Sequence, residues 1–166
     1  IMKHYYFYGH NEFYIAANSD NKSQLIVDFF LNYRYHCSDL SIDFEKDKVE
    51  IINDRYEKWK VNIIETGTCT ETAGRIKRLE KYIGNETFMC TYGDGVSDLN
   101  LKKLLEFHNN KGLIATLTSS NPPSRFGCLN VNDDKVTEFI EKPKDGKNIV
   151  NSGYFVFSPE IFKYIN

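Results

Sequence analysis

Apolar residues occur along this chain both in short continuous runs and at helical spacing. Short apolar runs bounded by turn residues are typical of buried strands, whereas apolar positions three or four residues apart are typical of helices. The runs predict strands over residues 12–17, 60–65, 87–90, 113–118 and 150–157. The helical spacing predicts helices over residues 23–33, 76–83 and 99–108, and Ser23 is a plausible N-cap for the first helix.

Two stretches alternate apolar and polar residues on either side of a turn, which predicts β-hairpins. The first hairpin joins residues 41–45 to 48–52, and the second joins residues 126–131 to 135–140 through Asn132, Asp133 and Asp134. Elsewhere strands alternate with helices. We therefore expect an α/β fold with a mostly parallel sheet and the hairpins as insertions.

Length and charge limit the classes of protein to consider. The 166 residues are enough for one domain with a sizeable core, so we expect a single domain over residues 1–166. The formal net charge of −2 argues against a nucleic-acid partner, and no apolar run is long enough to cross a bilayer. Four scattered cysteines form no CxxC pair, which favours reduced thiols over a zinc site or disulfides. This composition predicts a cytosolic globular domain.

The most informative segment is residues 91–95, Thr-Tyr-Gly-Asp-Gly, between a predicted strand and a predicted helix. Ligands of α/β sheets bind at the carboxyl ends of parallel strands. Gly93 and Gly95 allow the backbone to approach a phosphate or sugar, and Asp94 can hold a divalent cation through oxygen. An ordinary turn explains the same residues equally well. A calcium-binding EF-hand is excluded, because the twelfth position is Leu105 rather than glutamate.

Residues 70–75 precede a predicted helix that carries basic side chains. Small and hydroxylated residues before a helix N-terminus can form an anion-binding site, and Arg75 in the first turn can add a bidentate contact to a phosphate. A capped amphipathic helix with a solvated basic face explains this stretch without any ligand, and it is the better interpretation of the stretch in isolation.

Two further segments carry polar groups next to a proline or a glycine. Glu141 and Lys142 follow a predicted strand, and Pro143 favours an extended or turn geometry for Lys142. Asn151 comes just before Gly153 at the start of the last predicted strand. A charged hairpin end explains Glu141 and Lys142 without any ligand, and it is the better interpretation of this segment in isolation.

In this order, the segments resemble those of the sugar-1-phosphate nucleotidyltransferases. The likeness is carried by residues 65–78, 91–99, 122–127, 141–144 and 151–155, and it covers nearly the whole chain. Asn-Ser-Gly or Glu-Lys-Pro alone is a weak signal, but the ordered set is specific. The resemblance implies a Rossmann-like sheet of the nucleotide-diphospho-sugar transferase type, with hairpin insertions, in a homo-oligomer.

The resemblance also implies roles for individual residues. It makes Asp94 a ligand of the catalytic magnesium and places Gly93 against the substrate, whereas Thr70 and Arg75 would contact the nucleotide. The residues that would hold the sugar phosphate and its hydroxyls, or line the sugar pocket, are Gly127, Glu141, Lys142 and Asn151. The family commonly has glycine where this chain has Ala73, and the extra methyl group narrows the approach to the backbone in that loop.

Among these enzymes, the likeness is greatest to members that join CTP and glucose-1-phosphate into CDP-glucose and pyrophosphate, a step of lipopolysaccharide O-antigen biosynthesis. The implied chemistry is in-line attack by a sugar-phosphate oxygen, with magnesium and with no protein nucleophile. Other readings remain: a relative using dTTP, UTP or GTP, a metal-dependent glycosyltransferase using Asp94 and Asp98, or a non-catalytic binding module.

The chain lacks two motifs that are typical of the family. It contains no Gly-Gly-x-Gly-Thr-Arg loop followed by a lysine, and the second magnesium aspartate of the family would lie beyond Asn166. We therefore expect residues 1–166 to be part of a longer protein, incomplete at both ends and inactive alone.

Overall fold

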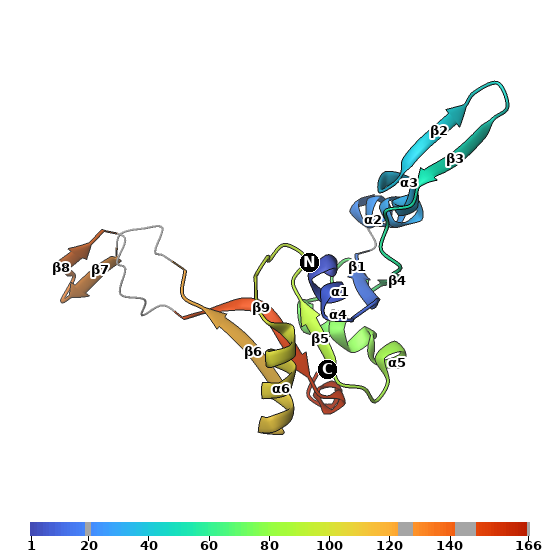
Figure 1. Ribbon diagram of the computed structural model, residues 1–166. Helices are drawn as coiled ribbons and strands as arrows, with labels where there is room; N and C mark the ends of the chain where they lie inside the picture. The colour runs from blue at the N-terminus through green and yellow to red at the C-terminus, as the bar shows by residue number, and fades with distance from the viewer. Residues whose placement is uncertain (19–20, 123–127, 142–148, 166) are drawn as a thin grey trace. The chain divides into compact units, whose positions relative to one another are not determined.

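The computed structural model describes residues 1–18, 21–122, 128–141 and 149–165 (Figure 1). Its backbone contacts divide the chain into two compact units: residues 1–86 with 159–166, and residues 87–158. A single domain over residues 1–166 stays a prediction. No helix in the described part of the chain is long and apolar enough to span a membrane.

The first unit combines short helices with two pairs of strands. Its elements are α1 (Met2–Phe7), β1 (Glu12–Ala17), α2 (Asn21–Leu31), α3 (Tyr33–His36), β2 (Asp39–Asp43), β3 (Lys48–Asn53), β4 (Lys60–Glu65), α4 (Thr72–Arg78), α5 (Glu80–Ile83) and the 3-10 helix η1 (Pro159–Lys163).

Strands β1 and β4 form a parallel pair, in register from Glu12 opposite Lys60 to Ala17 opposite Glu65. The pairing continues one residue further, since the backbone N–H of Thr66 donates to the Ala17 carbonyl at 2.9 Å. The Thr66 hydroxyl donates to the same carbonyl at 2.8 Å, and this residue is fully buried. The end of β4 is therefore fixed at the point where the chain leaves the sheet toward α4.

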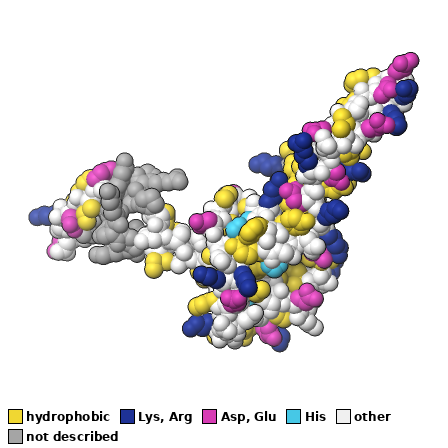
Figure 2. Space-filling view, in the orientation of Figure 1, with side chains coloured by type: hydrophobic (Ala, Val, Ile, Leu, Met, Phe, Trp, Pro, Cys, Tyr) yellow, Lys and Arg dark blue, Asp and Glu magenta, His cyan; other side chains and the backbone are white. Residues whose placement is uncertain are grey.

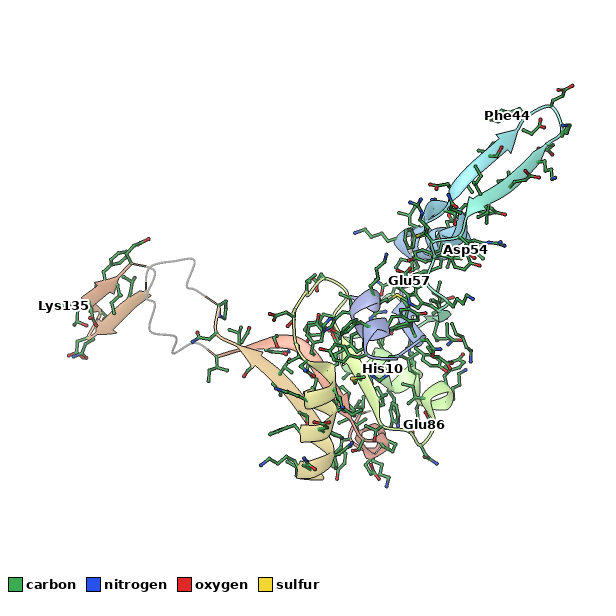
Figure 3. All side chains as sticks on the ribbon, viewed as in Figure 1. His10, Phe44, Asp54, Glu57, Glu86 and Lys135 are labelled. Carbon is green, nitrogen blue, oxygen red and sulfur yellow. The ribbon has the colours of Figure 1, made fainter. Side chains whose placement is uncertain are left out.

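Strands β2 and β3 form the antiparallel hairpin that the alternating sequence predicts, with Asp43 opposite Lys48. Asp47 in the turn has a φ of +50°, the left-handed conformation that such turns need. Phe44, labelled in Figure 3, lies at the turn end and is 91% exposed. Figure 2 shows that hydrophobic and charged side chains lie side by side along this hairpin.

The second unit contains β5 (Phe88–Thr91), α6 (Leu101–Lys111), β6 (Ala115–Ser120), β7 (Cys128–Asn132), β8 (Lys135–Ile140) and β9 (Val150–Phe157). Strands β5, β9 and β6 form one sheet with β9 in the middle (Figure 1). Because β9 is antiparallel to both neighbours, β5 and β6 run in the same direction. The carboxyl ends of β5 and β6 and the start of β9 therefore share one edge of the sheet.

Helix α6 packs on this sheet through an apolar face. Leu101, Leu104 and His108 are its buried residues, spaced so that they lie on one side of the helix. Asn100 caps its N-terminus by accepting a hydrogen bond from the Lys103 N–H at 3.0 Å, and Gly112 ends it in the left-handed conformation.

The buried side chain of His108 connects α6 to two strands. Its Nδ1 lies 2.9 Å from the Thr116 hydroxyl on β6, and its Nε2 lies 3.0 Å from the hydroxyl of Ser158, just after β9. His108 is only 2% exposed, so these hydroxyls take the place of water around its ring. The histidine thus fixes the helix against the sheet.

The predicted strands and hairpins are confirmed, with shifted ends, and so is the α/β class. The parallel arrangement is present directly in β1–β4, whereas the three-stranded sheet has an antiparallel middle strand. Two local predictions are wrong. Helix α2 begins at Asn21, so Ser23 lies inside it and its hydroxyl donates to the Asn18 carbonyl. The helix predicted over residues 76–83 is two short helices that start at Thr72.

Replacing His108 with leucine should lower the free energy of unfolding by about 1–3 kcal/mol, because the Thr116 and Ser158 hydroxyls lose their partner. Urea denaturation of the purified protein measures this. Glu106→Ala, an exposed change on the same helix, should stay within about 0.5 kcal/mol of the unchanged protein. Equal effects of the two substitutions would show that His108 does not hold α6 in place.

Candidate functional site

The candidate site begins at the sheet edge where β5 ends and β9 starts. The Tyr92 N–H and the Thr91 hydroxyl both donate to the Gly153 carbonyl, at 3.1 and 3.0 Å. Further on, the hydroxyl of buried Tyr154 donates to the Gly95 carbonyl at 3.0 Å. The loop that contains Asp94 is thus attached to β9 on both sides of the aspartate.

Asp94 presents its carboxylate at this edge. The side chain is exposed, and no described residue pairs with it or donates a hydrogen bond to it. Within the described ranges, no three His, Cys, Asp or Glu side chains gather as a ready-made metal cage. Magnesium is commonly bound by one or two carboxylates, with substrate phosphates and water as the other ligands. A single accessible carboxylate on a fixed loop fits that kind of site.

Gly93 and Gly95 have different surroundings. Apart from its two chain neighbours, no described residue would come within 4 Å of a Cβ added to Gly93, so the backbone can be approached there. A Cβ added to Gly95 would lie 3.7 Å from the Ser152 carbonyl oxygen, which is ordinary contact. Gly93 therefore has the freer backbone of the two, as expected for a residue that lies against a substrate.

Asn151 and Gly153 hold the aromatic ring of Tyr92 at the same edge. The Asn151 side chain accepts from the Gly153 N–H at 2.8 Å and donates to the Tyr92 hydroxyl at 3.4 Å. Gly153 has a φ of +79°, and a Cβ on it would lie 2.7 Å from Cδ2 of Tyr92. Only glycine fits both requirements, and Asn151 contacts the residue directly before Gly93.

Tyr92 itself was missed by the analysis of the sequence. The only indication in the sequence is that an aromatic residue at a strand end directly precedes Gly-Asp-Gly. The contacts of Tyr92 come from β9, which lies about sixty residues away in the chain. Nearby, the Thr118 and Ser152 hydroxyls lie 2.5 Å apart, so the edge is lined with hydroxyl and amide groups.

Cys90 on β5 is the cysteine nearest in sequence to this loop. Burial raises the pKa of its thiol to about 11, because an apolar environment disfavours the thiolate. The thiol is therefore protonated at neutral pH, and Cys90 is unsuited to act as a nucleophile or metal ligand.

The other predicted binding residues, Thr70 and Arg75, lie together in the first unit. Thr70 packs between two glycines: a Cβ on Gly67 would lie 3.1 Å from its Oγ1, and one on Gly74 would lie 2.9 Å from its Cγ2. Gly67 also has a φ of +80°. The two glycines thus leave just enough room for Thr70.

Arg75 and Arg78 both bind Thr66 at the end of β4. Arg75 Nη1 donates to the Thr66 hydroxyl at 2.7 Å, and Arg78 donates to the Thr66 carbonyl. The sequence analysis places Arg75 in the first turn of the helix. The structure instead places it in the last turn, because α4 begins at Thr72. An anion site at the N-terminus of this seven-residue helix is therefore not supported, although Arg75 keeps further N–H groups for a ligand.

The remaining predicted residues are less completely described. Glu141 follows β8 directly and is exposed, whereas Lys142 and Gly127 lie outside the described residues. The structure thus brings Gly93, Asp94 and Asn151 together at one sheet edge. It places Thr70 beside α4 in the other unit.

Comparison with known proteins identifies the family. The family profile described as nucleotidyl transferase matches residues 40–166, which is more than half of the chain. The chain belongs to the nucleotidyl transferase family. It is 38% identical over 167 residues to the glucose-1-phosphate cytidylyltransferase of Salmonella typhimurium, covering 100% of this chain and 64% of that protein. It is 42% identical over 166 residues to the "Probable glucose-1-phosphate cytidylyltransferase" of Bacillus subtilis, covering 99% and 63%.

A solved relative supports the fold. HddC from Yersinia pseudotuberculosis, in complex with GMP-PN, superposes with a TM-score of 0.63 at 23% identity, covering 98% of this chain and 62% of that one. The nucleotidyltransferase resemblance and fold expected from the sequence are confirmed. The chain spans 64% and 63% of the lengths of the two curated relatives.

Replacing Gly153 with alanine should destabilise the protein by about 2–4 kcal/mol, since it combines left-handed strain with a collision against the Tyr92 ring. Gly112→Ala is the matched control. Gly112 has a φ of +60° but nothing within 4 Å of an added Cβ, so strain alone should cost about 1 kcal/mol. Thermal or urea unfolding of both variants compares the two costs. A loss at Gly153 no greater than that at Gly112 would refute the close packing of Tyr92.

Proposed function

We propose that the whole protein transfers a cytidylyl group from CTP to glucose-1-phosphate, with CDP-glucose and pyrophosphate as products. The observation that carries the proposal is the exposed Asp94 carboxylate, fixed at the carboxyl end of β5 in a member of the nucleotidyl transferase family. The identity of 38% to the Salmonella typhimurium cytidylyltransferase supports CTP and glucose-1-phosphate as the substrates.

On this proposal the Asp94 carboxylate holds magnesium against the substrate phosphates. The bound cation would neutralise phosphate charge while the sugar phosphate and CTP approach each other. The hydrogen bonds from Tyr154 to Gly95 and from Tyr92 to Gly153 fix the backbone on both sides of Asp94 before substrates bind. Such preorganisation lowers the barrier, because the loop need not rearrange during the reaction.

Nucleotide binding is assigned to Thr70 and Arg75 of the first unit. In the described part of the chain Arg75 makes one side-chain hydrogen bond, to the Thr66 hydroxyl, and this bond fixes the guanidinium at the end of β4. Its other N–H groups can donate to the nucleotide. Thr70, packed between Gly67 and Gly74, offers its hydroxyl and backbone in the adjacent loop.

The sugar side is assigned to Asn151 and Glu141, together with Gly127 and Lys142. Asn151 is fixed by Gly153 and Tyr92 at the same edge as Asp94. Lys142 is assigned the sugar phosphate, since an ammonium group offsets the repulsion between two anionic substrates. A homo-oligomer and a role in supplying a nucleotide sugar for lipopolysaccharide O antigen complete the proposal.

Asp94→Asn in the whole protein should lower turnover by about two to three orders of magnitude, because the cation loses its carboxylate ligand. The assay follows pyrophosphate and CDP-glucose formed from CTP and glucose-1-phosphate at saturating magnesium. Asp98→Asn is the matched control: it is an exposed carboxylate four residues further on, and its loss should leave turnover nearly unchanged.

The same assay separates the alternatives. Product formation with dTTP, UTP or GTP in preference to CTP would keep the nucleotidyl transfer and change the base. Hydrolysis of a nucleotide sugar without pyrophosphate, lost equally in Asp94→Asn and Asp98→Asn, would identify a metal-dependent glycosyltransferase. Near-normal activity of Asp94→Asn would refute the role of this carboxylate.

A further inference from the structure

Tyr92 is an aromatic side chain held beside the candidate metal ligand, and none of the roles assigned above uses its ring. Tyr92 directly follows the end of β5 and precedes Gly93 and Asp94. Its side chain is 41% exposed. The ring is packed against Gly153, and its edge-to-face contact with Phe155 has a centroid distance of 5.6 Å. Because Gly153 and Phe155 contact one part of the ring, the exposed part is available to a ligand.

Asn151 fixes the ring from the side. The Asn151 Oδ1 accepts from the Gly153 N–H at 2.8 Å, which sets the orientation of the amide. The amide nitrogen then faces the Tyr92 hydroxyl, to which it donates at 3.4 Å. The ring is therefore in place before any ligand arrives, and little side-chain entropy is lost on binding.

The chemistry of the surface indicates what would bind. The ring is neutral and apolar, so the charged phosphates belong on the cation at Asp94 instead. Apart from its two chain neighbours, no described residue comes within 4 Å of a Cβ added to Gly93, so no distant described segment covers the backbone next to Tyr92. A pyranose has an uncharged C–H face with hydroxyls around its rim. This face matches the aromatic ring of Tyr92, and the hydroxyls match the neighbouring amide of Asn151.

We propose that Tyr92 is the platform on which the pyranose ring of the sugar phosphate packs, and that it determines specificity for the sugar. This inference rests on the proposed function. The C–H face of the pyranose covers the aromatic ring and excludes water, while the Asn151 amide keeps one N–H for a sugar hydroxyl.

The test is steady-state kinetics of the whole protein with CTP and glucose-1-phosphate varied separately. Tyr92→Leu removes the aromatic face and should raise KM for glucose-1-phosphate about tenfold, equivalent to about 1.4 kcal/mol. KM for CTP should stay unchanged. Tyr92→Phe keeps the ring and should stay within about threefold of the unchanged protein, since it loses only the long hydrogen bond from Asn151.

Tyr82→Leu is the matched control, because Tyr82 on α5 is 42% exposed and has no role in the proposed chemistry. It should leave both KM values unchanged. If Tyr92→Leu does not fold, Tyr92→Met replaces it with a flexible side chain that also lacks the ring. Circular dichroism establishes that each variant is folded.

The possible results separate this inference from the proposed function. An unchanged protein that forms no CDP-glucose refutes the proposed function. An active protein in which folded Tyr92→Leu or Tyr92→Met keeps its KM for glucose-1-phosphate refutes the platform alone. A rise in KM for CTP, alone or equal to the rise for glucose-1-phosphate, also overturns the platform.

Discussion

The pairing of β5 with the start of β9 is the constraint on which the candidate site depends. One carbonyl, that of Gly153, accepts hydrogen bonds from both the Tyr92 N–H and the Thr91 hydroxyl. Because β9 runs opposite to β5 and β6, its first residues meet the residues that follow those strands. The site is therefore made by the antiparallel strand in the middle of the sheet, which brings Asn151 to Asp94.

In both units a buried polar side chain forms hydrogen bonds to two partners near the end of a strand. In the first, Thr66 is fully buried, and its hydroxyl donates to Ala17 and accepts from Arg75. In the second, buried His108 binds hydroxyls of β6 and of the residue after β9. A buried polar group without a partner costs about 1–3 kcal/mol, so each network allows essentially one arrangement. In the first unit this network fixes the strand end beside Arg75. In the second unit it fixes the end of the sheet where β5 and β6 begin, opposite the end that carries Asp94.

The sequence predicts the strands and hairpins well, because these depend on local alternation and turn residues. The pattern at residues 132–134 is an example: Asp133 and Asp134 take φ values of +46° and +61°, as the hairpin turn requires. Helix starts were predicted less well. Ser23 has the chemistry of a cap but lies inside α2, and the start of α4 was placed four residues late. Several neighbouring polar residues can cap a helix, so local preference does not choose between them.

The candidate site was predictable only as far as single residues reveal their chemistry. Gly93 and Asp94 stand out in the sequence only together with the other segments of the resemblance, since an ordinary turn explains Gly-Asp-Gly equally well on its own. Tyr92 looks like an ordinary strand residue until Gly153 and Asn151 are brought to it by a pairing that spans about sixty residues. Gly153 illustrates the same limit, because its need for glycine comes from the Tyr92 ring as much as from its own backbone. A sequence pattern therefore cannot assign residues whose role depends on contacts distant in sequence. In this fold such residues, Tyr92 and Gly153, lie next to the loop that carries Asp94, whose role stays a prediction.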